Sequence, residues 1–121
     1  MTNDAPWGVR GLFGGLAFNG QLWVIGGQTS QGQTNDVWSS SDGAAWTEAT
    51  QAAPWTARNQ FGAAVLNNQL WVMGGNGYST FVLNDVWSSS NGVAWSEATS
   101  AAPWSGRYGL ATVAFNGQLW V

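Results

Sequence analysis

Short apolar runs alternate with clusters of glycine, asparagine and serine along the whole chain. Two of the runs are 61–66 and 69–73, and no segment shows the three- and four-residue apolar spacing of a helix. Neighbouring runs are joined by Asn-Gly or Asn-Asn pairs, at 19–20, 67–68 and 116–117. These residues tolerate the positive φ angles that a two-residue hairpin turn requires. The pattern therefore predicts an all-β chain of antiparallel hairpins.

An internal repeat organises this pattern. Asn-Asp-Val-Trp-Ser-Ser-Ser stands at 35–41 and again at 84–90, and Ala-Pro-Trp stands at 5–7, 53–55 and 102–104. The period is 49 residues between the first pair of segments and 48 where one loop residue is missing. A period near 50 is typical of β-propeller blades.

Each repeat unit contains four strand signals. In the second unit they are 61–66, 69–73, 85–89 and a segment around 95–98, and the second strand is expected to end at the glycines 74–75. We expect each unit to be a four-stranded antiparallel blade, with blade one at about 10–50, blade two at about 58–99 and a half blade at 107–121. Because propellers close with about four to eight blades, the single domain 1–121 is predicted to be a β-propeller fragment of about two and a half blades. Its open blade edges are expected to self-associate.

Several motifs suggest a family. They are a glycine doublet after an apolar strand, the Asn-Asp-Val-Trp strand, a fourth-strand tryptophan and the connecting Pro-Trp-x-x-Arg segment. With these motifs, nearly the whole chain resembles kelch repeats of bacterial proteins. Kelch units usually carry a tyrosine seven residues before the fourth-strand tryptophan, and this chain has Ser39 and Ser88 there, each beside a tryptophan. The turn at 40–46 is also similar to the Asp-box hairpin of sialidase-type propellers.

Some of the repeated residues are expected to serve the blades themselves. Glycine permits backbone angles that other residues resist, and tryptophans within strands are expected to fill the core. The structural candidates are Gly26, Gly27, Gly74, Gly75, Trp23, Trp46, Trp71 and Trp95.

The composition excludes several functions. The chain has no histidine, cysteine or lysine, so it lacks the usual zinc, copper and iron ligands, and we expect neither metal nor cofactor. A net charge of −3 disfavours nucleic acid and membrane surfaces as partners. The N-terminus does not have the pattern of a signal peptide, yet the surface resembles that of secreted or surface-attached bacterial kelch proteins, which implies an extracellular or cell-surface location.

Repetition of residues argues against catalysis, because a catalytic site needs different residues in different roles. The units differ most at the predicted loops 28–34 and 76–83, which should lie on one face beside the Pro-Trp-x-x-Arg connectors. We therefore predict a non-catalytic module that binds a protein segment or a glycan through this face. The ligand-contact candidates are Trp7, Arg10, Trp55, Arg58, Tyr78, Phe81, Trp104 and Arg107.

The same residues allow other interpretations. The arginines could bind a ligand carboxylate, or they could pair with Asp36, Asp85 or a backbone carbonyl; the connector tryptophans could face a ligand or pack between blades. A second function is a fragment of a propeller enzyme, galactose-oxidase-like or glycan-cleaving, whose active site lies in missing blades. A third is a designed or recently amplified repeat without a ligand.

Overall fold

The computed structural model describes residues 5–78 and 81–121, and over these residues it contains β-strands and no α-helix. The first sheet consists of β1 (Gly14–Phe18), β2 (Gln21–Thr29), β3 (Gly32–Ser40) and β4 (Thr47–Thr50). The second consists of β5 (Arg58–Asn59), β6 (Gly62–Leu66), β7 (Gln69–Gly77), β8 (Val82–Ser89) and β9 (Ser96–Thr99). A terminal hairpin follows, formed by β10 (Val113–Phe115) and β11 (Gln118–Trp120).

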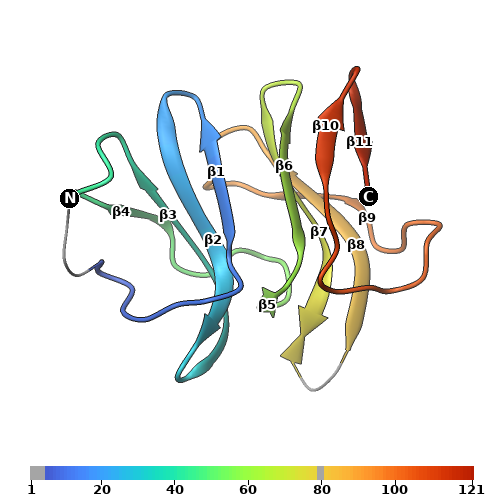
Figure 1. Cartoon of the computed structure of the whole chain (residues 1–121), viewed down its shortest axis with the longest axis horizontal. Helices are drawn as coiled ribbons and strands as arrows, with labels where there is room; N and C mark the ends of the chain where they lie inside the picture. Colours follow the sequence, from blue (N-terminus) through green and yellow to red (C-terminus); the bar gives the residue numbers. More distant parts are fainter. Residues whose placement is uncertain (1–4, 79–80) are drawn as a thin grey trace.

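The sheets are antiparallel meanders that stand side by side (Figure 1). Strand order is β1-β2-β3-β4 in the first sheet and β5-β7-β8-β9 in the second, where β6 also pairs with β7. None of the sheets closes on itself. The prediction of an all-β propeller fragment is confirmed, with antiparallel sheets of four, five and two strands; the second sheet has five strands, not the expected four, because β5 and β6 both pair with β7.

The hairpin turns follow directly from their sequence. Asn67 and Asn68 have φ angles of 51° and 57°, and the turns at 19–20 and 116–117 have the same left-handed backbone. These turns join β1 to β2, β6 to β7 and β10 to β11, all at the same end of the molecule (Figure 1).

The second strand of each blade does not end at its glycine doublet, so that prediction is wrong. Gly74 and Gly75 have φ angles of 60° and 99°, and they form a β-bulge after which β7 continues to Gly77. Positive φ at both glycines shifts the register of the ladder without stopping it. A Cβ on Gly75 would lie 2.6 Å from Phe61 Cβ, so this position also leaves no room for a side chain. Within the described residues, the predicted loops 28–34 and 76–83 are therefore mostly the far ends of two β-ribbons; positions 79–80 of the second loop lie outside the described residues.

The first strand of blade two is broken in a way that the pattern did not predict. Gln60, between β5 and β6, has a φ of 52°, and the equivalent Leu12 and Gly109 also have positive φ. The Gln60 N–H donates to the Leu12 carbonyl at 3.1 Å, and the Gly109 N–H donates to the Gln60 carbonyl at 2.8 Å. These bonds link each repeat to the next one along the chain.

Two apolar clusters hold the sheets together. The larger lies between the blades and includes Phe18 and Trp23 of blade one with Phe61, Leu70 and Trp95 of blade two. The smaller lies between blade two and the hairpin. Burial of these side chains is the main favourable contribution to the fold.

The strand tryptophans are buried to different degrees. Trp23 and Trp95 are buried as expected, whereas Trp46 and Trp71 are half-buried. Trp71 faces the β10–β11 hairpin, whose two strands cover less surface than a complete blade does.

Candidate functional site

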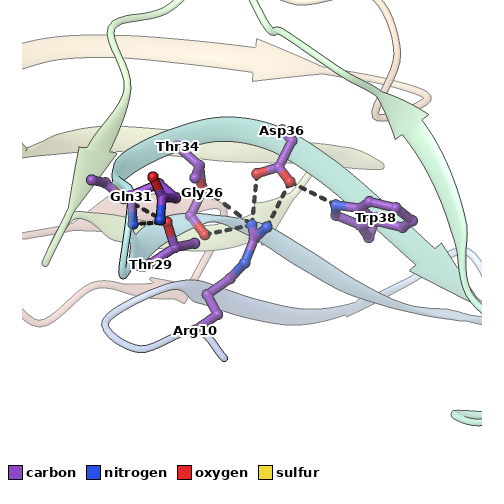
Figure 2. A network of polar contacts seen from close by, with 8 residues as sticks. Arg10, Gly26, Thr29, Gln31, Thr34, Asp36 and Trp38 are labelled. Atoms are coloured by element: carbon purple, nitrogen blue, oxygen red, sulfur yellow. Dashed lines mark hydrogen bonds and ion pairs between the residues drawn. The ribbon is translucent and has the colours of Figure 1, made fainter. Parts of the chain in front are cut away.

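The repeated arginines lie next to the repeated aspartates. Arg10 Nη1 and Nη2 each donate to a different oxygen of the Asp36 carboxylate at 2.6 Å, and Nη1 also donates to the Gly26 carbonyl at 3.0 Å (Figure 2). Trp38 Nε1 donates to Asp36 Oδ2 at 2.7 Å. Both oxygens of this carboxylate therefore already have donors.

Blade two repeats this network more deeply in the protein. Arg58 donates to both oxygens of Asp85 at 2.7 Å and to the Gly74 carbonyl at 2.9 Å, while Trp87 Nε1 donates to Asp85 Oδ2 at 2.8 Å. The Arg58 guanidinium also lies 5.7 Å from the ring centroid of Trp55. Bidentate pairing and stacking on an aromatic ring are both typical of buried arginine.

Both paired aspartates titrate below their ordinary range. Burial is the largest influence on Asp36 and opposes ionisation, but the hydrogen bonds from Arg10 and Trp38 help to outweigh it, so the pKa falls below 3.8. Burial is also the largest influence on Asp85, and there the hydrogen bonds and the charge of Arg58 lower the pKa below 3.8. Each carboxylate is ionised at neutral pH and serves as a fixed partner of its arginine.

Four of the predicted ligand contacts are accounted for by this packing. Arg58 is 0% exposed and Trp55 is 1% exposed, so neither reaches the surface. The Arg10 side chain is nearly as deeply buried in its pair with Asp36. Trp7 is half-buried beneath its neighbours. Their geometry matches the structural alternative, since the terminal nitrogens of Arg10 and Arg58 donate to an aspartate and to a glycine carbonyl within the blade.

The connector tryptophans pack edge-on against the fourth-strand tryptophans. The ring centroids of Trp7 and Trp46 are 4.6 Å apart and those of Trp55 and Trp95 are 5.8 Å apart, both in T-shaped arrangements. Trp104 is half-buried and packs against the smaller apolar cluster. Such pairs stabilise a fold beyond the area they bury.

Asparagine residues fix the connectors, and the sequence reasoning missed this role. Asn84 Nδ2 donates to the carbonyls of Ala102 and Trp104 at 3.1 and 3.0 Å, and the Ala102 N–H donates back to the Asn84 carbonyl at 2.9 Å. Asn35 makes the same bonds to its own connector. The signal was present, because an asparagine precedes Asp-Val-Trp in both units.

The exposed aromatic candidates lie at the ends of the ribbons. Tyr78 and Phe81 are each 69% exposed at the β7–β8 tip, and a Cβ on Gly32 of the β2–β3 tip would lie 4.0 Å from the Tyr78 ring. Tyr108, on the neighbouring connector, is also exposed. We call the surface formed by the ends of the two ribbons the ribbon-tip face; the ribbon ends lie opposite the hairpin turns (Figure 1).

Polar contacts hold the two ribbons together beneath this face. Gln33 Nε2 donates to the Asn76 carbonyl at 3.0 Å, and Asn59 Nδ2 donates to Gln28 Oε1 at 2.8 Å. The Arg107 N–H donates to a carbonyl of β8, which confirms that connectors and ribbons are neighbours. The Arg107 side chain is exposed and makes no ion pair with the described residues.

Two hollows lie beside the hairpin turns. One, of about 620 Å³, is open and lies between the turns at 67–68 and 116–117, with Trp71 and Trp120 in its wall. A second, of about 400 Å³, adjoins the turn at 19–20. Neither lining contains an acidic, basic or thiol side chain. Among the described residues, no three His, Cys, Asp or Glu side chains are grouped to hold a metal ion.

A scan against protein-family models found no family that matches this chain, and a search of curated proteins found no match either. In the part of the chain that the structure describes, no helix has the length and apolar character needed to cross a membrane.

Proposed function

We propose that the chain is a non-catalytic, kelch-like binding module that holds a protein segment or a glycan on its ribbon-tip face. The observation that supports this most is the exposure of Tyr78 and Phe81 on the ribbon where the two blades differ in sequence and length. Large aromatic rings are costly to expose without a use and are enriched at interface hot spots.

The scaffold beneath the face is suited to presenting contacts. In blade two, the Arg58–Asp85 pair and the Asn84 side chain hold β8 to β5 and to the following connector, and the bond from Gln33 to the Asn76 carbonyl holds the two ribbons together. A rigid support reduces the ordering cost of binding. Amide side chains near the tips, such as Gln31, offer both donors and acceptors to a sugar hydroxyl or a peptide group.

The test compares two variants for binding to a glycan array and to a displayed peptide library. Tyr78→Ser with Phe81→Ser should weaken every specific interaction that the unmodified chain shows. Val93→Ser changes an exposed apolar residue in the β8–β9 turn, away from the ribbon tips, and should leave binding unchanged. Both proteins should unfold at nearly the same denaturant concentration as the unmodified chain. Unaltered binding by the Tyr78/Phe81 variant would exclude the ribbon-tip face as the ligand site.

A further inference from the structure

Two apolar surfaces lie exposed at opposite ends of the row of sheets. On the terminal hairpin, Phe115 is 66% exposed and Trp120 is 53% exposed. On blade one, Phe13 and Leu22 are exposed, Leu22 to 46%. We call these the hairpin face and the blade-one face.

The interface between the two blades shows how such surfaces pack. Phe18 and Trp23, at positions equivalent to Phe115 and Trp120, are each only 5% exposed, because they pack in one cluster with Leu70 and Phe61 of the next blade. Trp23 is held by a 3.0 Å hydrogen bond from its Nε1 to the Phe18 carbonyl, and its ring lies against Gly92. Trp120 makes the same bond to the Phe115 carbonyl, at 3.2 Å.

The residues needed for the same packing are present at both ends of the chain. Residues 114–121 are identical to 17–24, so the hairpin offers the same phenylalanine and tryptophan as blade one does. By the repeat, Leu22 of blade one corresponds to the fully buried Leu70, and Gly43 corresponds to Gly92 with nearly the same φ, 73° against 74°.

Few charges lie near this contact. Residues 11–35 and 108–121 contain no Asp, Glu, Lys or Arg, and Asp42, next to Gly43, is an exposed carboxylate where the interior interface has Asn91. Charge at the contact is therefore confined to the rim beside Gly43. The centre of a stable protein interface has this same depletion of charged residues and enrichment in aromatic ones.

We propose that the hairpin face of one copy of this chain binds the blade-one face of a second copy, head to tail. The ring of Trp120 then lies against Gly43 of the second copy, and Phe115 packs beside its Leu22. One feature weakens the contact relative to the interior one. At the interior interface, the Phe61 ring of blade two packs on Gly14 of blade one, where a Cβ would lie 2.9 Å from the ring. In the proposed contact the equivalent residues are Phe13 of the second copy and Ala111 of the first, so the Ala111 Cβ requires Phe13 to shift.

Because the interface joins two different surfaces, it can be tested with complementary variants. Phe115→Asp places a charge on the hairpin face only, and Leu22→Asp places one on the blade-one face only. Each variant alone should be monomeric by sedimentation velocity up to about 100 μM, where the unmodified chain associates. An equimolar mixture should form a one-to-one dimer, because the first variant keeps its blade-one face and the second keeps its hairpin face.

Several outcomes would overturn the proposal. They are a monomeric unmodified chain at the highest concentration, association of either single variant to the extent of the unmodified chain, or a mixture that stays monomeric. Val93→Asp, which carries its charge on a turn outside both faces, should associate normally, and its failure to do so would point to a non-specific effect of charge. Tryptophan fluorescence and denaturant titration of each variant verify that it is folded before sedimentation.

Discussion

Replacing Gly92 with alanine should reveal how tightly the two blades are packed. A Cβ at this position would lie 2.5 Å from Trp23 Cη2 and closer still to Cζ3. The ring cannot turn away freely, because its Nε1 donates to the Phe18 carbonyl and its surroundings are buried. Overpacking of this kind costs about 1–3 kcal/mol. The φ of 74° adds about 1–2 kcal/mol for any residue with a Cβ.

Gly43 provides a matched control for the backbone contribution. Its φ is 73°, and a Cβ there would come no closer than 3.4 Å to another atom, Leu22 Cδ1. Gly43→Ala should therefore lower the free energy of unfolding through backbone strain alone, by about 1–2 kcal/mol. In urea or guanidinium titrations, the Gly92 variant should be less stable than the Gly43 variant by about 1–3 kcal/mol.

A double-mutant cycle separates the clash from other effects. Trp23→Leu removes the ring that the new methyl group meets, so in that background Gly92→Ala should cost no more than Gly43→Ala does. Equal destabilisation by the two glycine substitutions in the unmodified background would refute the packing of Trp23 against Gly92.

Three further predictions concern the buried polar network. Arg58→Ala leaves Asp85 without its partner and should lower the free energy of unfolding by about 3 kcal/mol, whereas Arg107→Ala, at an exposed side chain, should change it by less than about 0.5 kcal/mol; denaturant titration measures both. The pKa values of Asp36 and Asp85 are lowered from 3.8. Their stabilising contribution is therefore complete above that pH and is lost as the pH falls through the folded-state pKa values. The denaturant midpoint should drop in acid, and it should drop less in the Asp85→Asn variant. Asn84→Ala removes two hydrogen bonds to the connector and should lower the free energy of unfolding by about 1–3 kcal/mol. Asn91→Ala, at an exposed turn, is the comparison variant in the same denaturant titrations.

The arrangement of the strands could be predicted because local chemistry decides it. Asn67-Asn68 joins two apolar runs through a turn that few other residue pairs can form. Because the sequence repeats with a 49-residue period, the strands and turns predicted for one unit could also be predicted for the next. The turns at Asp42 and Asn91 are likewise local, since each residue accepts backbone N–H donors within its own turn.

Other features depend on contacts between distant residues, which spacing alone does not specify. The repeat placed an arginine and an aspartate in both complete units, but only the fold shows that Arg58 is buried, with both terminal nitrogens donating to Asp85, rather than exposed to a ligand. Positive φ at Gln60 was missed because glutamine gives no local sign of it, and the backbone bonds between neighbouring repeats hold that conformation. The glycine doublet was correctly expected to have unusual angles, yet those angles extend the strand instead of ending it.

The bulge at each glycine doublet separates a part of the hairpin that is the same in both blades from a part that differs between them. Before the bulge, Trp23 pairs with Ser39 and Trp71 pairs with Ser88, so the blades keep one register although the second hairpin contains an additional residue. The additional residue is accommodated entirely beyond the bulge. Ribbon tips can therefore differ in length and in side chains from one blade to the next while the strands before the bulge keep the same pairing.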